Sequence, residues 1–93
     1  MMSDANTRNK EYKIYLLPIA EKELSKLPEK IQEQIYDVIR TLKFPYQIPA
    51  IKMRNEKDTY RTKMTDYRII YKIYNKEVIV VVIKIGHRKK VYK

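Results

Sequence analysis

The last nine residues of the chain, 85–93, hold the side chains best suited to chemistry. They contain the only histidine and the only glycine of the protein, followed by cations and a tyrosine. Histidine exchanges protons near neutral pH, and arginine binds phosphate through a planar fork of donors. Tyrosine stacks on a nucleobase or, with a lowered pKa, transfers a proton. We therefore expect a phosphate-handling site built from His87, Arg88, Lys89, Lys90 and Tyr92, in which the two lysines supply general attraction.

A second group of cations lies in a predicted β-hairpin. Strand patterns over residues 59–64 and 67–74 leave two residues between them as a tight turn. A turn of that length pairs Lys63 with Arg68. Alternation of side chains along each strand then puts four cations on one face: Arg61, Lys63, Arg68 and Lys72. Like charges that face each other destabilise a sheet, so a bound anion is the simplest reason for them. The alternatives are a solvated face without a ligand, or a register slipped by one residue, which would turn Arg68 toward the core.

The net charge of +10 is distributed unevenly along the chain. Residues 1–44 carry a balance of +1, whereas residues 45–93 carry a balance of +9. A basic half of a small domain indicates a polyanionic partner, most often nucleic acid. A general enrichment in lysine would explain the total charge but not this asymmetry.

Composition excludes several classes of protein. The chain of 93 residues is long enough for one domain, and no apolar run reaches the ~20 residues of a membrane span. It has no cysteine, so disulfides and thiolate nucleophiles are excluded, and one histidine cannot form a histidine-based metal site alone. A single glycine cannot form a glycine-rich phosphate loop. We expect a cytoplasmic protein that contacts no membrane and needs no metal or cofactor.

The elements that must position these groups begin with a helical hairpin. A strand pattern over residues 12–17 leads to Pro18, which suits the first turn of a helix. Pro28 interrupts the apolar stripe of this helix, so a second helix is expected to begin at Glu29. Its apolar residues recur at helical spacing: Ile31, Ile35, Val38, Ile39 and Leu42. Two helices joined in this way can cover one face of a sheet.

A three-stranded meander is expected after the helices. Residues 44–49 contain two prolines and predict a connection, and the last strand should span residues 77–85 after a two-residue turn at Asn75-Lys76. Its apolar run, residues 78–83, predicts a central strand that is buried on both faces. Gly86 is expected to end this strand and to let the chain turn onto the cationic side of the sheet.

The order of elements is therefore β-α-α-β-β-β, which indicates an α+β fold. We expect a small single domain in which the two-helix hairpin packs on a mostly antiparallel four-stranded sheet. Residues 1–11 should form a flexible N-terminal segment, and residues 12–93 should form the domain.

Several short motifs follow one another in a fixed order after residue 11. They are Pro18-Ile19-Ala20-Glu21-Lys22-Glu23-Leu24, Lys26-Leu27-Pro28, Tyr60-Arg61-Thr62-Lys63, Tyr67-Arg68-Ile69-Ile70-Tyr71, and Gly86-His87-Arg88 with Val91-Tyr92. In order, spacing and charge the chain resembles the RelE/ParE-type toxins of prokaryotic toxin–antitoxin pairs. It is more similar to the RelE side, because the basic residues of the RNA-cleaving members and their terminal tyrosine are largely present.

The resemblance implies a RelE-like fold and an activity. RelE-like toxins are mRNA interferases, which are ribosome-dependent, metal-free endoribonucleases. They cut messenger RNA in the A site by attack of a ribose 2′-hydroxyl on the adjacent phosphate, and they need no cofactor. The implied partners are the ribosome, messenger RNA and a RelB-like antitoxin that covers or distorts the basic face.

The resemblance also implies roles for individual residues. Arg61 and Lys63 fall at a pair of active-site lysines, and Arg68 falls at a phosphate-binding arginine. Arg88 falls at the arginine near the leaving group, and Tyr92 at a tyrosine that stacks on or activates the substrate. These positions, with His87, are the candidate catalytic residues.

Five further cations complete the expected RNA-binding set, and two positions depart from the family pattern. Lys52 and Arg54 fall in a stretch that touches ribosomal RNA, while Lys72, Lys89 and Lys90 add general charge. Arg61 replaces a lysine, and arginine cannot act as a general base at neutral pH. His87 stands where the best-known member has lysine. The proton of the 2′-hydroxyl would go to one of three groups: Lys63, His87 or Tyr92.

Three other functions remain compatible with the sequence. A ParE-like inhibitor of DNA gyrase on the same fold would need none of the nuclease residues. A non-catalytic RNA- or ribosome-binding module would bind RNA with a steep salt dependence but would yield no cut products. A degenerate toxin would keep only the fold and the antitoxin interface.

Overall fold

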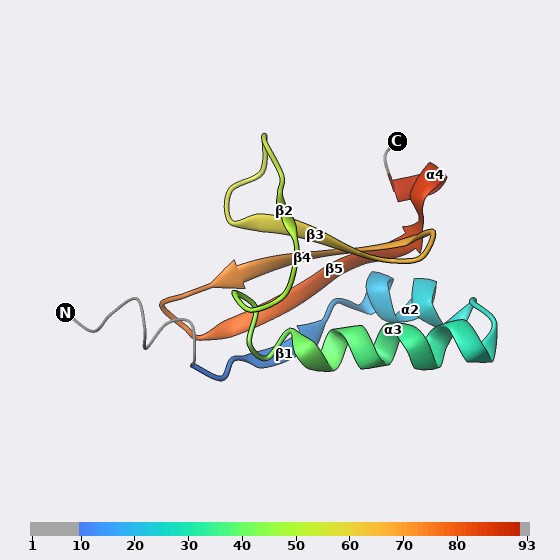
Figure 1. Ribbon diagram of the computed structural model, residues 1–93, viewed down its shortest axis with the longest axis horizontal. Coiled ribbons are helices and arrows are strands. Elements are labelled where there is room, and N and C mark those ends of the chain that lie inside the picture. Colours follow the sequence, from blue (N-terminus) through green and yellow to red (C-terminus); the bar gives the residue numbers. More distant parts are fainter. Residues whose placement is uncertain (1–9, 92–93) are drawn as a thin grey trace.

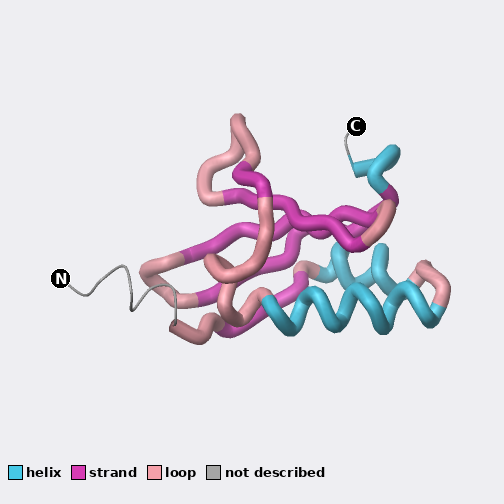
Figure 2. The backbone as a smooth tube through the Cα atoms, viewed as in Figure 1, coloured by secondary structure: helices cyan, strands magenta, loops and turns pink. Residues whose placement is uncertain are grey.

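The structure, a computed structural model, describes the backbone of residues 10–91 and the side chains of residues 10–89. The elements follow in the order β1 (Lys13–Leu16), α2 (Pro18–Ser25), α3 (Glu29–Thr41), β2 (Ile51–Lys52), β3 (Thr59–Met64), β4 (Tyr67–Tyr74), β5 (Ile79–His87) and α4 (Arg88–Val91). Helices α2 and α3 form one layer and the strands form the other, as predicted for an α+β fold (Figure 1, Figure 2). Most of the segment expected to be flexible lies outside the described residues. Within them, no helix is long and apolar enough to cross a membrane.

Prolines set the limits of the two long helices, as the sequence predicts. Pro18 is the first residue of α2, where its missing N–H costs no hydrogen bond, and Pro28 is the N-cap of α3. The side-chain amide of Gln32 donates to the carbonyl of Leu27 at 2.8 Å and holds the connection between the helices. The faces toward the sheet bury Ala20, Leu24, Ile35, Ile39 and Leu42.

The sheet has five strands rather than the predicted four. Their order is β1-β5-β4-β3-β2, in which β1 lies parallel to β5 and the other neighbouring pairs are antiparallel. The additional strand, β2, consists of Ile51 and Lys52, which pair with Arg61 and Tyr60. Two residues are too few to produce an alternating pattern, so nothing in the sequence distinguishes them from the preceding connection.

The hairpin of β3 and β4 has the predicted two-residue turn. Met64 pairs with Tyr67 and Lys63 pairs with Arg68, so two cations stand opposite each other. Thr65, the first residue of the turn, has a φ of 54°. This left-handed conformation is uncommon for a β-branched residue and costs of order 1–3 kcal/mol. Asp58 and Val78, at the other end of the sheet, also have a positive φ, so this conformation is not confined to the candidate site.

Two predictions about β5 were wrong: the two-residue turn before this strand and the burial of both its faces. β4 ends at Tyr74 and β5 begins at Ile79, so the connection spans residues 75–78 instead of two residues. β5 is the second strand of the sheet, and the described helices cover one of its faces. Val81 and Ile83 on the other side are therefore only half-buried. An unbroken apolar run in the sequence does not show that one face of the strand is covered less than the other.

Gly86 does not turn the chain. It lies inside β5, which continues to His87, and its φ is not positive. Gly86 pairs with Arg68 of β4. Because glycine has no side chain, the surface beside Arg68 is left open. Close approach of a ligand is one reason for a glycine within a strand.

A β-bulge interrupts the pairing of β4 with β5. Ile70 pairs with Lys84 while Tyr71 pairs with Val82, so Ile83 is an extra residue in β5. One inserted residue reverses the side to which all later side chains point. The β5 residues that are fully buried are accordingly Val80, Val82 and Ile85. Ile85 occupies the core position that an uninterrupted strand would give to Lys84.

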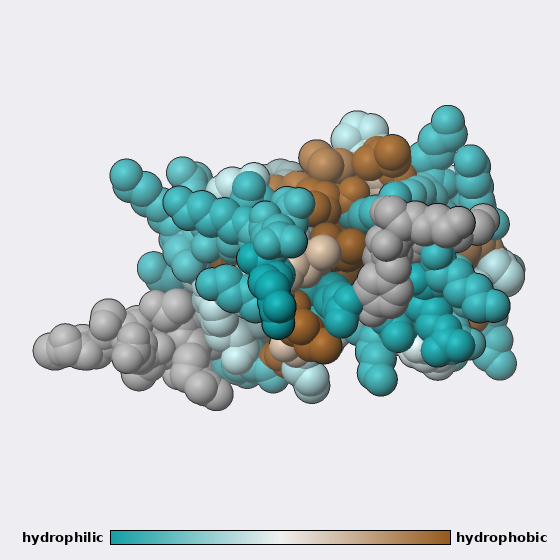
Figure 3. All heavy atoms as spheres, turned by 90° about the horizontal axis from the view of Figure 1, so that it is seen from above, coloured by the Kyte–Doolittle hydropathy of each residue, from teal (hydrophilic) through white to brown (hydrophobic). Residues whose placement is uncertain are grey.

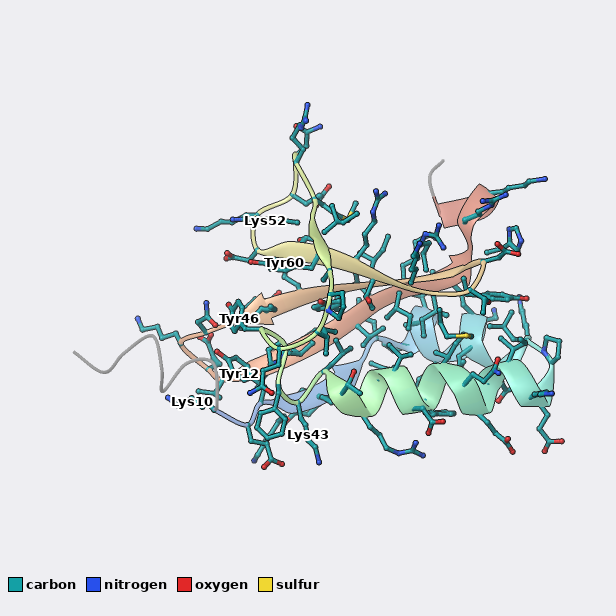
Figure 4. The ribbon with its side chains drawn as sticks, viewed as in Figure 1. Lys10, Tyr12, Lys43, Tyr46, Lys52 and Tyr60 are labelled. Atoms are coloured by element: carbon teal, nitrogen blue, oxygen red, sulfur yellow. The ribbon has the colours of Figure 1, made fainter. Side chains whose placement is uncertain are left out.

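A cluster of tyrosines joins several segments at the end of the sheet away from α4 (Figure 4). The hydroxyls of Tyr12 and Tyr46 both donate to the side-chain oxygen of Asn75, at 2.6 and 2.9 Å. The rings of Tyr60 and Tyr71 stack with their centroids 5.9 Å apart. Burial is the main cause that raises the pKa of Tyr12, Tyr46 and Tyr71 above the ordinary tyrosine value. The cluster links the start of β1, the connection after α3 and the turn before β5.

Removal of two hydroxyls of this cluster should have different effects on stability. Tyr12→Phe loses the bond to Asn75 and should lower the free energy of unfolding by about 1 kcal/mol. The Tyr71 hydroxyl is buried and has no hydrogen-bond partner among the described residues, so Tyr71→Phe should leave stability unchanged or raise it. Urea unfolding of both variants measures the difference. A loss in Tyr71→Phe as large as that in Tyr12→Phe would contradict these contacts.

Candidate nucleic-acid interface

Cations from three strands share the face of the sheet opposite α2 and α3. Arg61 of β3 and Lys84 of β5 both pair with Ile70, and Lys63 of β3 pairs with Arg68 of β4. Neighbouring strands lie about 4.8 Å apart, and the side chains of Arg61, Lys63 and Arg68 border a common space. We call this set the cationic face: Arg61, Lys63, Arg68, Lys72 and Lys84. The register of the strands places Arg61, Lys63, Arg68 and Lys72 on one face, as predicted.

The turn between β3 and β4 orients Arg68. One guanidinium nitrogen, Nη1, donates to the carbonyls of Thr65 and Tyr67, at 3.2 Å each. The arginine is therefore held at the end of the hairpin, beside Lys63 and Gly86. A guanidinium held in this way has a defined orientation, which suits the binding of a phosphate.

Helix α4 brings Arg88 to the same end of the sheet. The backbone N–H of Arg88 donates to the carbonyl of Asp66 at 2.8 Å, which ties the start of α4 to the turn of β3 and β4. Asp66 lies between Lys63 and Arg68 in the chain, and the Arg88 side chain is exposed. The start of α4 thus lies beside the turn that joins the strands of Lys63 and Arg68.

The side chain of His87 does not point to the cationic face. His87 pairs with Tyr67, on the side of the sheet toward the helices. Its ring meets the Tyr67 ring edge to face with centroids 5.6 Å apart, and Nδ1 accepts a hydrogen bond from the N–H of Lys89 at 3.3 Å. This position follows from the bulge at Ile83, because without the extra residue His87 would face the other way.

The remaining predicted RNA-binding residues are dispersed. Lys52 pairs with Tyr60 on the opposite side from the cationic face, and it lies near Tyr46 in the tyrosine cluster (Figure 4). Arg54 is exposed in the connection of β2 and β3, and Lys89 is exposed in α4. Lys72 lies at the far end of the cationic face, with its Nζ 5.5 Å from the centre of the Tyr74 ring. Two predicted groups, Tyr92 and the Lys90 side chain, lie outside the described residues.

A groove of about 880 Å³ runs between α3 and the edge of the sheet formed by β2 and β3. Its walls are mainly apolar and include Val38, Ile48, Pro49, Ala50 and Ile51. Arg61, Lys63 and Arg68 also line it, so the groove adjoins the cationic face. Figure 3 views the molecule from the side away from α2 and α3, and it shows apolar side chains in the middle of that face with hydrophilic ones around them.

Two features of the site had not been predicted from the sequence. Lys84 joins the cationic face only because of the bulge, and the groove depends on β2 and on the path of the chain after α3. The sequence does contain an indication of the position of Lys84. Lys84 interrupts a strand of valines and isoleucines at a position where plain alternation would bury it, and a lysine is almost never fully buried unless it is paired.

Comparisons with known proteins agree on one family. Residues 14–92 match the family model described as the ParE toxin of the type II toxin–antitoxin system parDE. The mRNA interferase toxin RelE of Escherichia coli K12 is 34% identical over 72 residues, which cover 74% of this chain and 75% of that protein.

Solved structures give the same result. The intact E. coli RelBE toxin–antitoxin complex matches with a TM-score of 0.73 and 29% identity, over 82% of this chain and 95% of that one. The RelBE2 complex of Mycobacterium tuberculosis matches with a TM-score of 0.76 at 24% identity, over 86% and 94% of the two chains. The second match supports the fold alone.

The paired cations should lower the stability of the free protein. Lys63→Gln removes the like charge opposite Arg68 and should raise the free energy of unfolding by about 0.2–1 kcal/mol. Urea unfolding at low and at high salt measures this gain, which should shrink at high salt because exposed charges are screened. Lys76→Gln, in the exposed turn before β5, is the control and should change little. Equal effects of the two substitutions would contradict the assigned repulsion.

Proposed function

The chain belongs to the RelE/ParE family of toxins of type II toxin–antitoxin systems, and we propose that it is an mRNA interferase. In this proposal it enters the ribosome and cuts messenger RNA in the A site, without a metal ion. One observation carries the proposal. Arg61, Lys63 and Arg68 share one face, and α4 ties Arg88 to the end of that face through Asp66.

The proposed reaction is an internal transfer at a phosphate. The ribose 2′-hydroxyl loses its proton and attacks the adjacent phosphorus, and the bond from phosphorus to the 5′-oxygen breaks. The departing 5′-oxygen takes up a proton, which leaves a 2′,3′-cyclic phosphate and a 5′-hydroxyl. Negative charge grows on the phosphate during attack, and fixed cations stabilise it. Arg61 and Arg68 serve this role, and Arg88 stabilises the leaving oxygen.

In the proposed reaction the general base is either Lys63 or Tyr92. Arg61 cannot accept a proton at neutral pH. The ring of His87 faces Tyr67 on the helix side, away from the phosphate-binding cations. Lys63 lies within the cationic face itself, and Tyr92 would approach it from the C-terminal segment.

We propose that the antitoxin docks in the groove beside α3. An amphipathic helix would place its apolar side against Val38, Ile48 and Ile51. Acidic residues of that helix would meet Arg61, Lys63 and Arg68, which line the same groove, and would neutralise the cationic face. The charge of the groove thus favours an acidic antitoxin helix over a neutral partner.

Inhibition of DNA gyrase is the second candidate, because the matching family model is described as the ParE toxin. It would not depend on the cationic face or on Arg88. Broken DNA with intact messages after expression of the toxin would favour this candidate.

Expression of the protein alone, followed by mapping of messenger RNA ends, tests the proposed cleavage. We expect cuts between codon positions of translated messages. Arg88→Ala should reduce cutting by about 100-fold or more, as expected for the loss of one charge-stabilising donor. The adjacent substitution His87→Ala is the matched control and should retain cutting. Equal losses in both variants, or uncut messages, would sink the proposal.

Substitutions at two equally exposed isoleucines test the antitoxin site. Ile51 lies in the groove and is 58% exposed, whereas Ile19 on α2 is 56% exposed and lies outside it. Ile51→Asp should weaken the complex with the antitoxin by at least tenfold, because it puts a charge in an apolar contact. Ile19→Asp should leave affinity unchanged. Calorimetric titration measures both, and the reverse result would place the antitoxin elsewhere.

A further inference from the structure

We propose that Lys84 binds a backbone phosphate of the RNA, next to the phosphate that is cut, and that Glu23 holds its ammonium group ready for this contact. The inference rests on the proposed function and adds to it a residue that the family pattern does not assign. Three features of the structure carry it: the bulge at Ile83, the position of Lys84 beside Arg61, and the double use of the Glu23 carboxylate.

The bulge determines where Lys84 points. Val80 and Val82 face the core, so uninterrupted alternation would turn Lys84 into the core as well. The extra residue Ile83 instead gives that core position to Ile85 and sends Lys84 to the cationic face. Bulges beside active sites commonly re-aim a side chain in this manner.

Pairing across the sheet places Lys84 next to the proposed RNA site. Lys84 and Arg61 flank Ile70 on adjacent strands, and the next row toward α4 holds Lys63, Arg68 and the bare Gly86. Backbone atoms of Lys84 and Arg61 are thus about 10 Å apart, two strand spacings, and the side chains can bind successive phosphates of one strand.

Glu23 of α2 makes two contacts with β5, and only one of them involves Lys84. β1 pairs with β5 only as far as Leu16 and Val82, so the N–H of Ile85 lies beyond the end of β1. Glu23 Oε1 accepts that N–H at 2.9 Å, and Oε2 lies 3.3 Å from the Lys84 Nζ. The carboxylate therefore keeps a partner when Lys84 turns away.

The exchange of Glu23 for a phosphate costs little. The side chain of Lys84 is 41% exposed, and ion pairs at such a surface contribute little to stability. A phosphate offers a full negative charge and several acceptor oxygens in place of the carboxylate. Glu23 thus keeps the ammonium near the site without competing strongly for it.

Salt-dependent binding of RNA to the full-length protein tests this role. The probe is a short single-stranded RNA with 2′-O-methyl riboses, which lacks the attacking hydroxyl and cannot be cut. The slope of log affinity against log salt counts the phosphates that the protein neutralises, at about 0.7 per phosphate on a single strand. Lys84→Met should reduce the magnitude of the slope by about 0.7, Lys84→Arg should restore it, and Lys30→Met on α3 should not change it.

Glu23→Gln separates phosphate binding from a purely structural ion pair. Glutamine keeps an oxygen for the Ile85 N–H but loses the charge near Lys84, so the slope should stay at the wild-type value and affinity should hold or rise a few-fold. Equal losses of affinity in Glu23→Gln and Lys84→Met, with both slopes unchanged, would overturn the inference. A wild-type protein that does not bind the probe would also overturn it.

The role of Lys84 and the proposed cleavage can be refuted separately. Uncut messages after expression would refute cleavage, but they would leave the salt slopes of the uncuttable probe unaffected. Cleavage at the wild-type rate together with a wild-type slope in Lys84→Met would refute the role of Lys84 alone.

Discussion

The pairing of β4 with its two neighbours is the constraint on which the cationic face depends. On the helix side, β4 buries Ile69, Tyr71 and Ile73. Burial of each large apolar side chain stabilises the fold by about 1.5–3 kcal/mol, whereas a pair of like charges across strands costs about 0.2–1 kcal/mol. A slip by one residue would separate Lys63 from Arg68 only by exposing the whole core side of the strand. The hydrophobic core therefore holds the cations together against their repulsion.

The two ends of the sheet differ in what they contribute to stability. At one end Tyr12 and Tyr46 share the amide oxygen of Asn75, and the hydroxyls there remain uncharged. At the other end stand the facing cations Lys63 and Arg68. A small domain can keep unfavourable charge at one end when hydrogen bonds and packing fix the strands at the other.

The features that local chemistry determines could be predicted from the sequence. Pro18 and Pro28 set the helix starts because proline lacks the N–H that a helix interior requires. The two residues between β3 and β4 fixed the hairpin register, and with it the common face of Arg61, Lys63 and Arg68. By contrast, the two-residue strand β2 exists only because β3 offers it an edge, and the groove beside α3 follows from that contact. No pattern within the segment itself encodes either feature.

The bulge at Ile83 had the largest effect on the predicted site, because one extra residue reverses the side of every later side chain in β5. It brings Lys84 onto the cationic face and moves His87 off it, to the ring of Tyr67. The face therefore gains a lysine and loses the only side chain whose ordinary pKa lies near neutrality. What remains is a group of lysines and arginines, which in the proposed function bind phosphates and stabilise the charge that grows on one of them. In the proposed reaction, proton transfer would then come from Lys63 or from the C-terminal segment. The first residue of α4, Arg88, lies at the same end of the sheet through its contact with Asp66.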